Sequence, residues 1–110
     1  MQSSQIETIV KTEVKDKVQP KQAPLYHVIL WNDDSHTFDY VIIMMHDLFG
    51  YPVERGFQIA KTVHTQGKAI VLTSSLEEAE FKRDQIHAYG SDPEMRDCVG
   101  SMFSTLELAR

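Results

Sequence analysis

Residues 25–38 read LYHVILWNDDSHTF, and the change of character within this stretch largely decides the fold. Its first seven residues are rich in β-branched and aromatic side chains, which is typical of a strand. The strand pattern stops at Asn32, and two adjacent carboxylates, Asp33 and Asp34, follow at once. Asx side chains suit a turn because they hydrogen-bond nearby backbone amides. One such residue would suffice, however, and adjacent acids repel each other, so the pair suggests a positively charged ligand.

Beyond this turn, apolar residues at helical spacing predict two consecutive helices. Thr37 can cap a helix that runs to Phe49 and ends at Gly50. The next helix has Pro52 at its first position and stops at Gly67. The apolar faces comprise Phe38, Val41, Ile42, Met45 and Phe49 in the first helix and Val53, Phe57, Ala60, Val63 and His64 in the second.

The rest of the chain completes an α+β pattern. The segment KAIVLTS predicts a second strand, and SLEE is a capping box in which Ser75 caps a third helix and Glu78 reaches back. That helix is expected to run to about Tyr89, and GSMFSTLEL predicts the last strand after a polar loop. The order β-α-α-β-α-β predicts three helices packed on a three-stranded antiparallel sheet.

Length and composition bound the organisation of the chain. At 110 residues it forms one domain. Residues 1–22 are rich in lysine and glutamine and lack aromatics, so we expect a flexible N-terminal extension before a folded domain over residues 23–110. Cys98 stands alone, which excludes an internal disulfide and favours a reducing compartment.

Several partners are disfavoured by charge and hydropathy. A net charge of -5 without a basic stripe argues against nucleic acid. The longest apolar run, residues 40–45, is far too short to span a bilayer, and the N-terminus lacks the layout of a signal peptide. We therefore expect a cytoplasmic protein that acts as a monomer, without membrane or nucleic-acid contacts.

Metal chemistry finds no support in the sequence. A calcium loop needs a Glu at its twelfth position, but counting from Asn32, Asp33 or Asp34 reaches Ile43, Met44 or Met45. The five histidines lack the spacing of zinc ligands, and there is no cysteine pair. We expect neither a metal nor a cofactor.

His64 leaves two interpretations open, because it lies on the apolar face of its helix. It is either a satisfied core group or a neutral ring that accepts a hydrogen bond. With Asn32 and the two aspartates it would form a pocket with an acceptor-rich rim and an apolar floor. Such a site suits a ligand that is cationic at one end and hydrophobic at the other. A small acid-base enzyme using Asp33 or Asp34 with His64 is the rival interpretation, and nothing in the sequence places Cys98 beside a histidine.

Five segments resemble the ClpS family, the adaptors of the Clp protease. They are YHVILWNDD, FGYPVERG, VHTQGKAIV, EEAEFK and STLE, and they span roughly Pro24 to Glu107. The resemblance implies a protein without catalytic activity. It would recognise proteins with a free N-terminal Phe, Leu, Tyr or Trp and deliver them to a Clp AAA+ unfoldase, ClpA- or ClpC-like, for ATP-dependent degradation.

The resemblance also assigns roles by position. The residues matching the family's α-amine and peptide-backbone ligands are Asn32, Asp33, Asp34 and His64. The residues matching its hydrophobic pocket are Phe38, Val41, Ala60, Val63 and Met102. Glu77 and Lys82 match its unfoldase-docking surface, although a solvated helix face explains them as well.

The chain departs from the family pattern around the pocket. His36-Thr37-Phe38 stands where the family usually has Thr-Pro-Met, and Ala60 replaces a pocket Met. The loop from Ser91 to Gly100 looks longer than usual. These changes leave the preferred N-terminal residue open. They also leave open a Clp-docking module that has lost N-terminal recognition.

Overall fold

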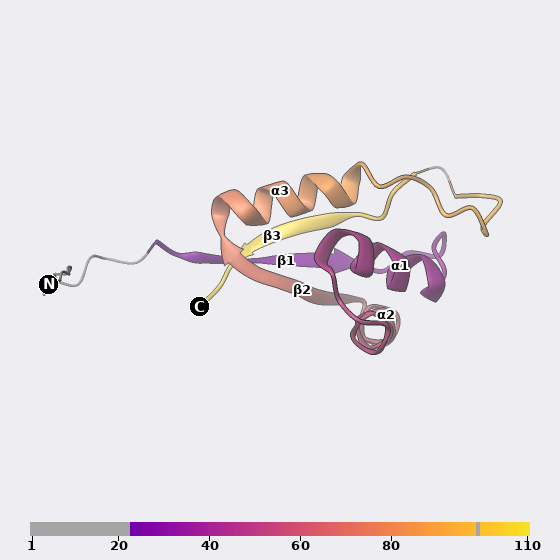
Figure 1. Ribbon diagram of the computed structural model, residues 1–110, viewed down its shortest axis with the longest axis horizontal. Helices are drawn as coiled ribbons and strands as arrows, with labels where there is room; N and C mark the ends of the chain where they lie inside the picture. The colour runs from indigo at the N-terminus through magenta and orange to yellow at the C-terminus, as the bar shows by residue number, and fades with distance from the viewer. Residues whose placement is uncertain (1–22, 99) are drawn as a thin grey trace, which may run out of the picture.

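The computed structural model describes residues 23–98 and 100–110 (Figure 1). The predicted flexible extension, residues 1–22, lies outside the described residues. The elements follow in the order β1 (Leu25–Trp31), α1 (Phe38–Phe49), α2 (Val53–Gln66), β2 (Lys68–Ser75), α3 (Leu76–His87) and β3 (Ser104–Leu108). The predicted β-α-α-β-α-β order is confirmed.

The three strands form one antiparallel sheet in the order β2-β1-β3, so β1 is central. Val28 pairs with Leu72 on one side and with Leu106 on the other, and the β1–β2 register shifts between Val28 and Ile29. Helix α3 packs against all three strands, whereas α1 packs mainly against α2, near the end of β1 (Figure 1). The turn after β1 therefore lies at the junction of the sheet with α1 and α2.

One hydrophobic core joins these layers. Its fully buried large side chains come from β1, α1, β2 and α3: Val28, Leu30, Met44, Met45, Val71 and Ile86. Burying each such side chain contributes roughly 1.5–3 kcal/mol. Gly56 lets α1 and α2 approach closely, because a Cβ at this position would lie 3.1 Å from the Cα of Ile42.

The predicted helix signals are confirmed at most ends. The Thr37 hydroxyl accepts the backbone N–H of Tyr40, and Gly67 ends α2 at φ 89°, a left-handed conformation that suits glycine. Pro52 is the cap of α2 rather than its first residue. Ser75 accepts the Glu78 amide as predicted.

Three predicted details were wrong. The Glu78 carboxylate accepts the hydroxyl of Ser74 rather than reaching back to the cap. Helix α3 ends at His87, two residues early, and β3 begins at Ser104 rather than at Gly100. Gly100 and Ser101 bond outside the sheet: Gly90 donates to the Ser101 hydroxyl, and the Gly100 carbonyl faces a histidine ring.

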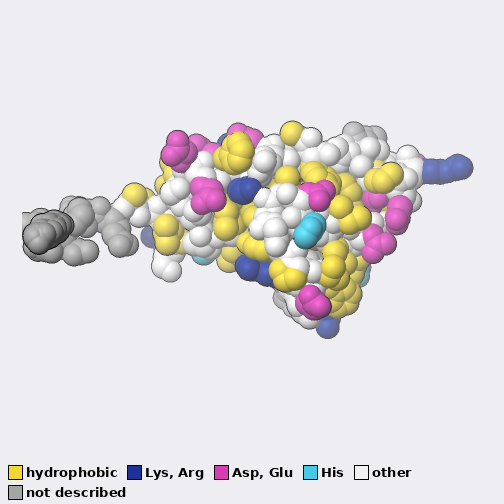
Figure 2. All heavy atoms as spheres, in the orientation of Figure 1, with side chains coloured by type: hydrophobic (Ala, Val, Ile, Leu, Met, Phe, Trp, Pro, Cys, Tyr) yellow, Lys and Arg dark blue, Asp and Glu magenta, His cyan; other side chains and the backbone are white. Residues whose placement is uncertain are grey.

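The surface agrees with the charge pattern of the sequence. On the face drawn in Figure 2, Lys and Arg side chains lie scattered among apolar, acidic and other groups. Within the part of the chain that the structure describes, no helix combines the length and the apolar character that crossing a bilayer requires.

Candidate binding pocket

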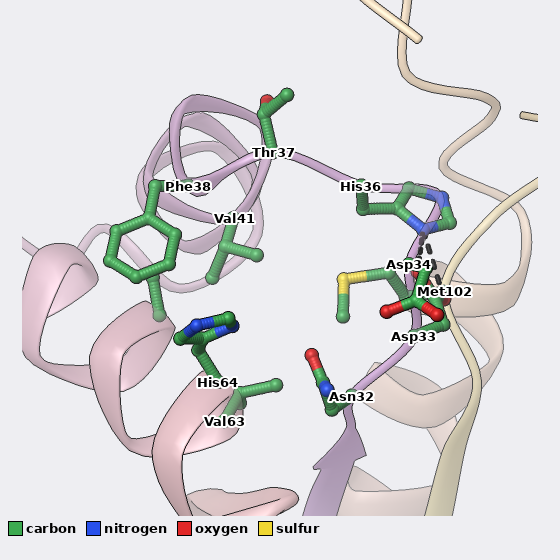
Figure 3. Close-up of a pocket in the computed structure, with 11 residues that line it drawn as sticks. Asn32, Asp33, Asp34, His36, Thr37, Phe38, Val41, Val63, His64 and Met102 are labelled. Atoms are coloured by element: carbon green, nitrogen blue, oxygen red, sulfur yellow. Dashed lines mark hydrogen bonds and ion pairs between the residues drawn. The ribbon is translucent and has the colours of Figure 1, made fainter.

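A cavity of about 260 Å³ opens where the end of β1, the start of α1 and the second half of α2 meet (Figure 3). It is lined by Asn32, Asp33, Asp34, His36, Thr37, Phe38, Val41, Ala60, Val63, His64 and Met102. Every residue that the sequence predicted for the acceptor cluster and the apolar pocket is in this set. His36 and Thr37 are additional.

Two backbone hydrogen bonds bring these distant segments together. The N–H of Asn32 donates to the Gly67 carbonyl over 2.9 Å, which joins the turn after β1 to the end of α2. The N–H of Trp31 donates to the Phe103 carbonyl over 3.1 Å, which joins the last residue of β1 to the residue before β3. The acceptor turn, the helix that carries His64 and the segment that carries Met102 therefore meet at one end of the sheet, where its central strand ends.

The two aspartates differ in their surroundings. Asp33 Oδ1 accepts the backbone N–H of Ser35 over 2.8 Å, so the predicted Asx turn is present. The same carboxylate is held by His36 Nδ1, at 2.8 Å from Oδ1 and 3.0 Å from Oδ2, and the Asp33 side chain stays 35% exposed. Asp34 is exposed, as is Asn32.

His64 is exposed at the pocket and is not a satisfied core group. Among the described residues its ring nitrogens have no hydrogen-bond partner, and its ring meets that of Phe38 edge-on at 5.7 Å. Figure 3 shows the side chains of Asn32 and His64 approaching the same space from β1 and from α2. Both side chains carry atoms that can accept a hydrogen bond.

The floor of the pocket is apolar and buried. Val41, Ala60, Val63 and Met102 are each at most 4% exposed. Phe38 forms a wall above this floor, because its ring lies edge-on against both Phe57, at 5.8 Å, and His64. Phe57, Ala60 and His64 lie on one face of α2, so the Phe38 ring bridges the two helix turns that separate Phe57 from His64.

His36 is the residue that sequence reasoning missed. Its side chain is only 3% exposed, with Nδ1 on Asp33 and Nε2 2.8 Å from the Gly100 carbonyl. Its ring packs on Tyr40 with centroids 4.5 Å apart. Cys98 Sγ lies 3.2 Å from the same Nε2, so the structure does place the cysteine beside a histidine. The only sequence signal was the presence of His36 where the family has Thr.

The loop after α3 is held by a buried carboxylate. Asp92 is 3% exposed, and its Oδ2 accepts the Thr37 amide over 2.7 Å and the Thr37 hydroxyl over 2.8 Å. Burial favours the neutral acid, but these bonds and the Glu94 amide outweigh it and hold the pKa of Asp92 below its ordinary value. The Ser-Asp-Pro sequence, typical of an Asx turn, was the available signal.

The two predicted docking residues lie apart from the pocket, on α3. Glu77 is exposed in the first turn, and the Lys82 ammonium donates to the Leu48 carbonyl near the end of α1. Phe81, next to Lys82, is 59% exposed. Within residues 23–98 and 100–110, no three His, Cys, Asp or Glu side chains are grouped so that they could hold a metal ion.

Known proteins share this sequence and this fold. Residues 21–95 match the family model described as "ATP-dependent Clp protease adaptor protein ClpS". The adapter protein ClpS of Pectobacterium carotovorum is 40% identical over 91 residues, which cover 83% of this chain and 84% of that protein. The Vibrio cholerae adapter protein ClpS is 39% identical over 80 residues, covering 73% and 76%.

Among solved structures, Agrobacterium tumefaciens ClpS2 matches with a TM-score of 0.69, covering 80% of this chain and all of that one. At 24% identity this likeness establishes the fold.

Fold, pocket and relatives together define a protease adaptor. The chain belongs to the ClpS family of ATP-dependent Clp protease adaptor proteins. Proteins of this family are adaptors and not enzymes, which removes the acid-base enzyme built on Asp33 or Asp34 and His64. An adaptor of the Clp protease implies two kinds of partner, the Clp machinery and the proteins it degrades.

Proposed function

We propose that this adaptor binds proteins with a free hydrophobic N-terminal residue, Phe, Leu, Tyr or Trp, and delivers them to a Clp AAA+ unfoldase, ClpA- or ClpC-like, for ATP-dependent degradation. One observation carries the proposal: a single cavity joins an acidic, acceptor-rich rim to a buried apolar floor. A protein N-terminus has the matching pair of groups within one residue.

The rim suits an α-ammonium group. At neutral pH this group is a cation with three N–H donors. Asn32, Asp33 and His64 supply three acceptors on the cavity, and Asp34 adds a nearby negative charge. Each charge-assisted hydrogen bond contributes about 1.5–3 kcal/mol before the costs of association. An internal peptide bond has no ammonium, so the site should ignore it.

The floor suits the first side chain. An apolar cavity of about 150 Å³ holds benzene in a well-studied case, and the cavity here is about 260 Å³. Burying a Phe or Leu side chain against Val41, Val63 and Met102 contributes about 1.5–3 kcal/mol. The solved Agrobacterium ClpS2 is described as bound to L-phenylalaninamide, which combines a free α-amine with a phenyl ring. That ligand supports the same pairing here.

The test compares two fluorescent peptides that begin with Phe, one with a free α-amine and one acetylated. Acetylation removes the charge and two of the three donors while keeping the ring, so the acetylated peptide should fail to bind in fluorescence anisotropy. Equal binding of the two peptides would reject the ammonium site.

A variant sharpens this test. Asp33→Ala should weaken binding of the peptide with a free α-amine by about 2 kcal/mol or more, roughly 30-fold in affinity. Asp39→Ala is the matched control, because it removes one negative charge from the exposed first turn of α1, outside the pocket lining. Delivery is then measured as degradation of a Phe-led reporter by a purified Clp unfoldase and peptidase. Unfoldase binding without binding of either peptide would favour the docking module that has lost N-terminal recognition.

A further inference from the structure

We propose that His36 is a positioning residue that fixes the Asp33 carboxylate for the incoming ammonium and ties it to the chain segment that forms the pocket floor. This inference rests on the proposed function, because it concerns the acceptor side of the same site. His36 acts through Asp33.

The geometry on the Asp33 side determines which acceptor atom remains available. Oδ1 accepts both the Ser35 amide and His36 Nδ1, each over 2.8 Å, whereas Oδ2 has only the longer 3.0 Å contact to the same ring nitrogen. The carboxylate is thereby held by two groups, and Oδ2 keeps acceptor capacity for a ligand. Figure 3 shows Asp33 directed toward the His36 ring.

The other side of the ring reaches the floor. His36 Nε2 lies 2.8 Å from the Gly100 carbonyl, two residues before Met102. The ring is held against Tyr40, whose hydroxyl donates to the Gly90 carbonyl over 2.5 Å. One buried side chain therefore spans the turn after β1 and the segment that enters β3, which are more than sixty residues apart.

The contacts around the ring limit its motion. Nδ1 bonds the Asp33 carboxylate, and Nε2 lies 2.8 Å from the Gly100 carbonyl and 3.2 Å from Cys98 Sγ. The His36 side chain is only 3% exposed, so turning the ring would break these contacts where water cannot replace them. The ring therefore holds the Asp33 carboxylate in one orientation.

Two neutral variants separate the two bonds. The amide of Asn reaches about as far as Nδ1 of a histidine, and the amide of Gln reaches about as far as Nε2. His36→Asn keeps a donor for Asp33 and loses the tie to Gly100, whereas His36→Gln keeps that tie and loses the donor. Both replace the ring by a neutral amide of similar chemistry, so the difference between them reports the position of Asp33.

Affinity for Phe-led and Leu-led peptides is measured by anisotropy. We expect His36→Asn to stay within about threefold of the native protein and His36→Gln to bind about tenfold more weakly, the cost of one charge-assisted bond. The loss should be equal for both peptides because the apolar floor is unchanged. His87→Asn is the control, since His87 also bonds backbone near this segment, at Ser104, the first residue of β3, but lies outside the pocket lining.

Equal affinities of the Asn and Gln variants would overturn the positioning role, and so would a change in the Phe-to-Leu ratio, which would indicate a reshaped floor. A native protein that binds neither peptide would overturn the proposed function first. The native protein also offers a test without variants: peptide binding should shift the ring ¹⁵N signals of His36 more than those of His46, exposed on α1. Unshifted His36 signals would contradict the proposal even if the variants failed to fold.

Discussion

The pocket wall predicts a preference among N-terminal residues. Phe38 and Ala60 stand where two methionines usually line this pocket in the family, and the Phe38 ring contacts Phe57 and His64 on the face of α2 that carries Ala60. The change to examine is the double variant Phe38→Met, Ala60→Met. It restores a flexible side chain at the wall and fills the room beside it, so total volume is roughly kept while the shape changes.

The size of the expected preference for Phe over Leu follows from the contacts between aromatic rings. The Phe38 ring already meets Phe57 and His64 edge-on at 5.8 and 5.7 Å, distances within the range of favourable aromatic pairs. A ligand ring entering beside Phe38 can add one more such pair, which contributes about 0.5–1.5 kcal/mol beyond burial. That free energy corresponds to a preference of about 2- to 12-fold for Phe over Leu. Ala60 should also admit the larger Tyr and Trp rings.

The assay is competition anisotropy with Leu-, Phe- and Trp-led peptides that are otherwise identical. The native protein should favour Phe and Trp, and the double variant should lose that preference while keeping its affinity for Leu. Phe57→Leu is the matched control, because it removes the outer partner of Phe38 without altering the cavity lining. An unchanged Phe-to-Leu ratio in the double variant would refute the reasoning.

Three further predictions concern stability and delivery. Asp92→Asn should lower the free energy of unfolding at pH 7 by about 1–3 kcal/mol, because the Thr37 amide and hydroxyl lose a charged acceptor. The folded-state pKa of Asp92 lies below its ordinary value, so its contribution is full above the ordinary value and is lost as the pH falls through the lower folded value. Thermal unfolding followed from pH 7 into acid should show the stability gap between the variant and the native protein closing. Deleting residues 1–22 should leave peptide affinity and thermal stability unchanged but impair degradation of a reporter, and loss of peptide binding would place the extension in the pocket. Glu77→Lys should reduce delivery without changing peptide affinity, and a Glu77→Gln variant tests whether the charge reversal itself is needed.

Much of the fold could be predicted from local signals. Thr37, Gly50, Gly67 and Ser75 each mark a helix end by a property of one residue, and the helix faces follow from spacing. The start of β3 could not be predicted this way. Residues 100–103 alternate like a strand, but the Gly100 carbonyl faces the His36 ring and the Ser101 hydroxyl accepts the Gly90 amide. Such bonds depend on segments far away in the chain.

The same distinction between local signals and contacts with distant segments decides which site residues could be predicted. Asn32, Asp33 and His64 could be placed together because they lie in segments that match one family, and the Asn32–Gly67 backbone bond joins those segments in space. His36 and Asp92 had no such support. Each bonds a partner far away in the chain, His36 to Gly100 and Asp92 to Thr37. A single buried histidine or aspartate has no sequence periodicity that would distinguish it from an exposed one.

The proposed site offers a physical reason why two adjacent aspartates, Asp33 and Asp34, follow β1. A carboxylate that receives a ligand must be held still, and holding Asp33 uses the Ser35 amide and the His36 ring. Those bonds partly satisfy the carboxylate and leave Oδ2 with acceptor capacity. Asp34 is exposed and adjacent, so it adds a second negative charge at the rim. In the proposed site one aspartate then provides geometry and the other provides charge. This division predicts that Asp34→Asn weakens binding more at low than at high ionic strength, because a screened field is the only contribution it loses; a loss independent of salt would instead indicate a direct contact with the peptide.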